Sequence, residues 1–193
     1  MTQVPVTRSS NVWLSSATTM GVVVAALWVL EFIDGLTNNA LDAFGISPRQ
    51  VASLPEIFSA PFLHFGWGHL MSNTVPLFVL GTLILASGVR PFLIVTLTSI
   101  LSSGILVWLI SPSGTVTLGA SGVIFGYLTY LLARAFYTRS WWQLAIAVVV
   151  GVLYGGVLWG VLPLTYGVSW QAHLGGAIGG LLAARLLHRR VVA

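Results

Sequence analysis

One serine, two histidines and one asparagine are the residues of this sequence whose types and spacing could do chemistry. Ser121 lies in GASGVIFG, His173 in AHLGGAIGG, and His69 and Asn73 in HFGWGHLMSN. A serine hydroxyl becomes a nucleophile when a histidine takes its proton, and imidazole and amide groups can donate hydrogen bonds to an oxyanion. These residue types suit acyl transfer, provided that the fold brings them together.

The elements that must position these residues are apolar helices. The chain has 193 residues, of which 56% are hydrophobic and only 6% charged, too few charges to cover a water-soluble globule of this size. A helix needs about 20 apolar residues to cross a hydrocarbon core of roughly 30 Å. We therefore expect an all-α integral membrane protein, a single domain over 1–193 with a short N-terminal segment, 1–11, and six membrane helices. The expected helices are 12–33, 68–87, 91–110, 120–136, 141–162 and 170–187.

The charged residues predict the orientation of this six-helix bundle. Seven of the eight arginines fall on one side of it, and Arg49 falls with all four acidic residues on the other side. By the positive-inside rule both termini are expected to be cytoplasmic. The arginines are scattered over four segments, so topology explains the pI of about 10.1 better than nucleic-acid binding does. The absence of cysteine excludes thiolate chemistry.

Counting helical rise places the polar residues in one layer of the bundle. Ser121 is 13 residues from Arg134 and His173 is 12 residues from Arg185, about 20 and 18 Å at the usual rise. His69 and Asn73, which are 21 and 17 residues from Arg90, are expected nearer the outer rim. Alone, Ser121 could be a helix-packing residue and His173 a hydrogen-bonded structural residue, but their matched depths favour a catalytic pair.

Glycine spacings predict how the last helix packs. Two overlapping G-x-x-x-G spacings begin at Gly175 and Gly176, and a third begins at Gly122, directly after Ser121. Such spacings favour close helix contact. We expect the spacing that begins at Gly175 to face the one that begins at Gly122, so that Ser121 and His173 can meet.

Three of these stretches resemble the motifs of the rhomboid intramembrane serine proteases. GASGVIFG looks like their Gly-x-Ser-Gly nucleophile motif with Ser121 as the serine, and AHLGGAIGG looks like their last-helix motif with His173 as the base. HFGWGHLMSN looks like their His-x4-His-x3-Asn motif, with His69 and Asn73 in oxyanion positions. The resemblance covers about 12–187. The sequence departs from the family pattern at two places. Its first external loop lacks the frequent Trp-Arg pair, and it has Phe125 where some members have Tyr.

The resemblance implies a bacterial six-span protease of the plasma membrane. It would cleave single-span membrane proteins near the outer face with a Ser121–His173 dyad and no cofactor, its partners being transmembrane substrates and lipid. The oxyanion donors would be His69, Asn73 and the Ser121 backbone N–H. Phe125, Tyr127 or a backbone acceptor would orient His173. The remaining supporting residues would be His64, Gly119 and Gly122.

Three other functions compete with this interpretation. A zinc protease could use His64, His69 and His173, but the first two are five residues apart, and neither an H-E-x-x-H motif nor a nearby carboxylate completes such a site. A catalytically silent rhomboid-like protein would be expected to lack Ser121 or His173. A small transporter would more often carry paired charges at mid-membrane.

Overall fold

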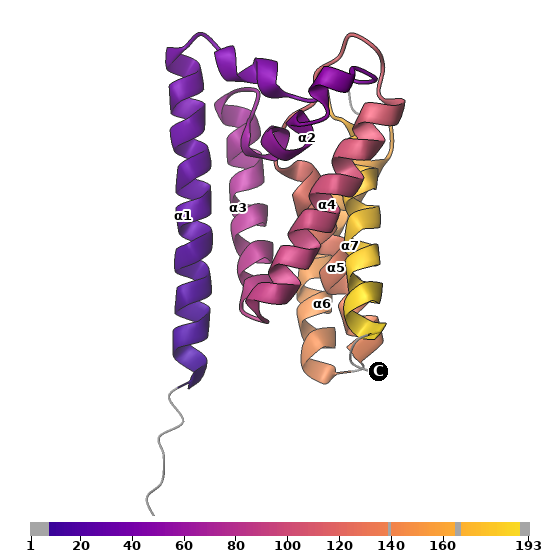
Figure 1. Cartoon of the computed structure of the whole chain (residues 1–193). Helices are drawn as coiled ribbons and strands as arrows, with labels where there is room; N and C mark the ends of the chain where they lie inside the picture. Colours follow the sequence, from indigo (N-terminus) through magenta and orange to yellow (C-terminus); the bar gives the residue numbers. More distant parts are fainter. Residues whose placement is uncertain (1–7, 139, 165–166, 190–193) are drawn as a thin grey trace, which may run out of the picture.

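The fold is a bundle of helices, as expected from the composition (Figure 1). The structure, a computed structural model, describes residues 8–138, 140–164 and 167–189, and within these ranges it has seven α-helices and no strand. Six α-helices are long: α1 (Arg8–Leu36), α3 (Gly66–Leu85), α4 (Val89–Ile110), α5 (Ser121–Thr138), α6 (Trp141–Tyr154) and α7 (Trp170–Arg189). The shorter elements are α2 (Glu56–Ser59) and the 3-10 helices η1 (Ala40–Phe44), η2 (Val51–Ser53), η3 (Ala60–Phe62) and η4 (Gly155–Val161).

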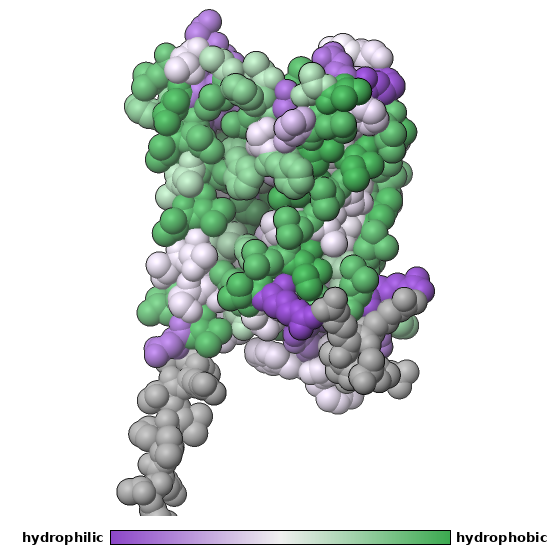
Figure 2. All heavy atoms as spheres, in the orientation of Figure 1, coloured by the Kyte–Doolittle hydropathy of each residue, from purple (hydrophilic) through white to green (hydrophobic). Residues whose placement is uncertain are grey.

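Among the described residues, three helices are long and apolar enough to cross a membrane. These are Asn11–Leu36, Gly66–Leu85 and Val89–Ile110, and they correspond to the expected segments 12–33, 68–87 and 91–110. On the face that Figure 2 shows, apolar side chains cover most of the side of the bundle, and the strongly hydrophilic ones gather towards its two ends. This distribution suits a molecule whose sides contact lipid.

The other three expected segments correspond to shorter or less apolar helices. Segments 120–136 and 170–187 correspond to α5 and α7, which pack on each other inside the bundle. The expectation of one continuous α-helix over 141–162 is wrong, because α6 ends at Tyr154 and continues as the 3-10 helix η4. Gly155 and Gly156 follow Tyr154 directly, and adjacent glycines have a low helix propensity.

Helix α7 is the centre of the packing. It lies against both α5 and α4, while α6 packs on α5 and α1 packs on α3 at the edge of the bundle (Figure 1). A Cβ added at Gly176 would lie 3.1 Å from the Cα of Gly122 on α5, whereas one added at Gly175 would lie 2.7 Å from the Cα of Ser103 on α4. The expected contact between the Gly175 and Gly122 spacings is therefore wrong. Successive helical residues point about 100° apart, so the two spacings serve two different neighbours.

The long connection between α1 and α3 is folded over one end of the bundle, at the top in Figure 1. An antiparallel bridge joins Ile46 to Thr117, in the loop before α5. The Arg49 guanidinium donates hydrogen bonds to the Leu109 carbonyl at 3.1 Å and to the Ser113 hydroxyl at 2.6 Å. These contacts fix the connection to the α4–α5 loop, which leads directly to Ser121.

The close approach of α7 to α5 predicts the effect of one added methyl group. Gly176→Ala should lower the free energy of unfolding by about 1–3 kcal/mol, because the new Cβ would meet the backbone of Gly122, which cannot rotate away. Gly35→Ala is the matched control in α1, since no heavy atom lies within 4 Å of its Cβ position. Thermal unfolding of both variants in detergent checks this, and equal melting temperatures would contradict it.

Candidate active site

Ser121 and His173 are in direct contact. Ser121 is the first residue of α5 and His173 lies in the first turn of α7. The Ser121 hydroxyl oxygen is 2.9 Å from Nε2 of His173. The small residues between α5 and α7 allow this distance, because they let the two backbones approach closely.

A backbone carbonyl and an aromatic ring hold the imidazole of His173. Its Nδ1 lies 2.9 Å from the carbonyl oxygen of Gly160, in η4. Since a carbonyl can only accept, Nδ1 carries the proton, and Nε2 is left to accept from the Ser121 hydroxyl. The ring also stacks on Phe125, with centroids 4.1 Å apart and planes 9° apart. Tyr127, the other aromatic residue considered from the sequence, instead shares a hydrogen bond with Thr96.

His69 and Asn73 line the same cavity as Ser121 and His173, a hollow of about 470 Å³. The Phe65 N–H donates to Nδ1 of His69 at 3.4 Å, so the neutral ring carries its proton on Nε2. The side-chain amide of Asn73 donates one N–H to the His69 carbonyl at 3.2 Å and keeps a second N–H. Both side chains can thus donate a hydrogen bond, the property expected of them from the sequence.

Gly119 and Gly122 occupy positions where a side chain would disturb the site. Gly119 has φ of +125°, a conformation that favours glycine, and its N–H donates to the Ala60 carbonyl at 2.8 Å. A Cβ at Gly119 would lie 2.5 Å from the ring of His69. A Cβ at Gly122 would meet the Ser103 hydroxyl, which donates to the Ala172 carbonyl at 2.9 Å.

His64 supports the site from outside the cavity. It lies in the loop before α3, only 2% exposed, and its Nε2 accepts the Ala120 N–H at 3.4 Å. Its ring meets that of His69 edge to face, at 5.1 Å. Burial, together with the neighbouring His69, lowers the pKa of His64 to about 4. Neutral His64 therefore contacts both Ala120, the residue before Ser121, and His69, one of the two side chains that can donate a hydrogen bond.

The sequence did not identify the residues whose carbonyls accept two hydrogen bonds of the site. The acceptor for His173 is the carbonyl of Gly160, and the acceptor for Gly119 is the carbonyl of Ala60. Every residue has a carbonyl, so no residue type marks either position in a sequence.

As for metals, no cluster of three histidine or acidic side chains suited to an ion occurs within the described ranges.

Fold and site together describe a bundle of α-helices with a serine–histidine pair in a cavity that polar and apolar side chains both line. The family model for the Rhomboid domain matches residues 51–190, and the chain belongs to the rhomboid family. Members of this family are generally intramembrane serine proteases, and family membership together with the apolar helices indicates an integral membrane protein.

Similar proteins occur in several organisms. An uncharacterized protein of Mycobacterium tuberculosis is 42% identical over 183 residues, which cover 91% of this chain and 76% of that protein. The rhomboid protease GluP of Bacillus subtilis is 30% identical over 174 residues, covering 85% of this chain and 33% of GluP. The rhomboid-like protease 5 of Toxoplasma gondii is 34% identical over 161 residues, covering 80% of this chain and 18% of that protein.

The environment of His64 predicts an acid-dependent loss of stability. Its pKa of about 4 in the folded protein lies below the ordinary value of 6.5, so its contribution is complete above about pH 6.5 and is lost as the pH falls towards 4. Gln can accept the Ala120 N–H without titrating, so His64→Gln should reduce the fall in melting temperature between pH 7 and about pH 4. Thermal unfolding across this range checks the difference, and parallel curves for the two proteins would contradict it.

Proposed function

We propose that this protein is an intramembrane serine endopeptidase that cleaves single-span membrane proteins. The observation that carries the proposal is the 2.9 Å contact between the Ser121 hydroxyl and Nε2 of His173, with Nδ1 engaged by the Gly160 carbonyl. A nucleophile, its base and a group that orients the base are the elements of nucleophilic acyl transfer. The proteases of the family that match this chain support the same reaction.

The reaction would run in two halves. His173 takes the proton of Ser121 as the serine oxygen attacks the scissile carbonyl carbon, and His173 then returns the proton to the leaving amine. A water molecule, deprotonated by His173 in its turn, hydrolyses the acyl-serine ester and frees the hydroxyl. No carboxylate is needed, because the Gly160 carbonyl keeps the proton of the resting imidazole on Nδ1.

Three donors would stabilise the oxyanion of the tetrahedral intermediates. Ser121 begins α5, so its N–H has no intrahelical partner, and the positive end of the helix dipole lies there. His69 and Asn73, on α3, add the N–H groups described above at the lining of the same cavity. Removing one such donor typically lowers turnover by about 10²–10³-fold.

The proposed topology is that of a single six-span domain with both termini in the cytoplasm. The arginine asymmetry supports this orientation, and α5, α6 with η4, and α7 would be the spans beyond the three long apolar helices. The mycobacterial and Bacillus relatives support a bacterial plasma membrane. Substrate helices would have to unwind near the cavity, because an intact helix keeps its amides hydrogen-bonded.

The dyad is tested by labelling with a fluorophosphonate and by cleavage of a membrane-protein substrate in detergent. Wild-type protein should label at Ser121, and Ser121→Ala and His173→Ala should each abolish cleavage. The double variant should be no worse than either single one, because members of a catalytic unit are not additive. Cleavage that EDTA abolishes and zinc restores would favour a metalloprotease instead, and an unreactive Ser121 would favour a silent, helix-binding relative.

The close contact between Gly160 and His173 predicts that a side chain added at position 160 lowers catalytic efficiency strongly. A Cβ there would lie 2.9 Å from Nδ1 of His173 and 3.0 Å from the ring of Phe125, displacing the imidazole. Gly160→Ala should therefore lower kcat/KM by roughly 10²-fold, the scale expected for a catalytic group misplaced by about 1 Å. Gly156→Ala, in the same 3-10 helix with no heavy atom within 4 Å of its Cβ position, is the control. Equal kcat/KM for the two variants would show that the imidazole keeps its catalytic position despite the added Cβ, and would contradict this prediction.

A further inference from the structure

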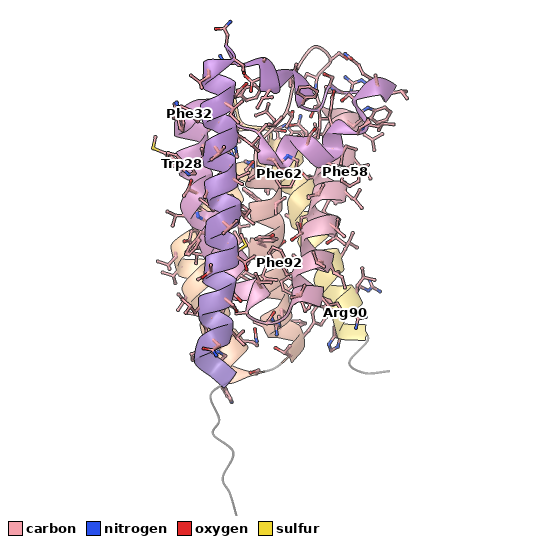
Figure 3. The ribbon with its side chains drawn as sticks, turned by 60° about the vertical axis from the view of Figure 1, so that its left-hand side comes forward. Trp28, Phe32, Phe58, Phe62, Arg90 and Phe92 are labelled. Atoms are coloured by element: carbon pink, nitrogen blue, oxygen red, sulfur yellow. The ribbon has the colours of Figure 1, made fainter. Side chains whose placement is uncertain are left out.

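A second cavity lies at the end of the bundle opposite the Ser121–His173 pair. It has a volume of about 480 Å³, within the range of small-molecule sites, and opens between the start of α4 and the ends of α5 and α7. Its polar lining includes Arg90 on α4, Arg134, Tyr130 and Tyr137 on α5, and His188 on α7. Figure 3 shows Arg90 at this lower end of the bundle. We call it the basic cavity.

No side chain of this protein supplies a negative charge to the basic cavity. The four carboxylate side chains of the sequence belong to Glu31 and Asp34 near the end of α1, Asp42 in η1 and Glu56 in α2. All of them lie at the other end of the bundle, where α1 ends (Figure 1). Within the part of the chain that the structure describes, the two guanidinium groups therefore have no acidic partner, and an external anion would neutralise them.

The helix dipoles do not account for both arginines. Arg134 lies near the C-terminal end of α5, just before its last turn, and His188 lies in the last turn of α7. A cation is favourable near the C-terminal end of a helix in any case. Arg90 lies in the first turn of α4, where the dipole is positive and a cation is unfavourable. An anion beside Arg90 would be stabilised by both the guanidinium and the helix N-terminus.

Aromatic rings give the basic cavity firm walls. The ring of His188 stacks on Tyr137, with centroids 4.8 Å apart and planes 21° apart. Arg134, which is half-buried, lies beside the hydroxyl of the buried Tyr130. Arginine presents a planar fork of donors that matches phosphate oxygens, and the phenol hydroxyl adds a further donor.

The depth of the basic cavity matches the headgroup region of a bilayer. Helix α6 begins just after α5 ends, at this end of the bundle, and its first two residues are Trp141 and Trp142. These side chains are 85% and 68% exposed. Exposed tryptophans at helix ends mark the membrane–water interface, and basic pockets between helices at that level suit phosphorylated headgroups.

We propose that the basic cavity binds the phosphate of an anionic phospholipid, held by Arg90 and Arg134. A soluble phosphate has the same recognised group, so the two sources have to be separated by experiment. The site is independent of the proposed proteolysis, because it lies at the other end of the bundle from Ser121 and His173.

The test is a binding titration of the purified full-length chain in neutral detergent. Phosphatidylglycerol and phosphatidylcholine with the same acyl chains are compared by native mass spectrometry, and inorganic phosphate is added as a competitor. Arg90→Gln and Arg134→Gln should each raise the Kd for phosphatidylglycerol by at least about tenfold. Arg185→Gln is the matched control, since Arg185 is exposed on α7 and does not line the basic cavity.

Each outcome of the titration decides the proposal. Phosphatidylglycerol bound more tightly than phosphatidylcholine, with a loss confined to the Arg90 and Arg134 variants, supports a lipid site. Displacement of that lipid by inorganic phosphate supports the same site with a soluble phosphate as a second source. Equal weakening by Arg185→Gln, or equal affinity for the two lipids, overturns the proposal in favour of diffuse surface charge. Arg90 is exposed, so Arg90→Gln keeps the test decisive even if Arg134→Gln unfolds.

Discussion

The contact of α7 with α5 is the constraint on which the rest of the structure depends. Where Gly176 passes Gly122, there is no room for even one methyl group between the two backbones. A bulkier residue at either position would move the helices apart, and the hydrogen bond between the Ser121 hydroxyl and His173 could not keep its length of 2.9 Å. In lipid, where burial of apolar surface does little to hold helices together, such close packing supplies much of the attraction between them.

The same packing explains how an imidazole can be held without a charged partner. A carboxylate beside His173 would have to be buried among apolar helices at a large desolvation cost. The carbonyl of Gly160 and the face of Phe125 restrain the ring while adding no net charge. A neutral pair of serine and histidine is thus compatible with a chain whose side-chain carboxylates all precede α3.

Much of this site could be predicted from residue types and helical rise. Similar distances from the arginines placed Ser121 and His173 at about one depth, and the structure brings them into contact. The prediction that the spacing beginning at Gly175 faces the one beginning at Gly122 was wrong. Two spacings that start one residue apart look alike in a sequence until the neighbouring helices are known. The end of α6 at Tyr154 was also missed, because an apolar stretch such as 141–162 does not distinguish an α-helix from a 3-10 continuation.

The acceptor for His173 has a consequence for genetics. An oxygen of the main chain is present whatever amino acid the codon specifies, so no missense change can delete it. Scanning mutagenesis at Gly160 reports only how much room the new side chain needs, since its Cβ position is already close to two rings. The hydrogen bond itself has to be probed through the chemistry of the backbone, for example by replacing the peptide carbonyl with a weaker acceptor during protein semisynthesis.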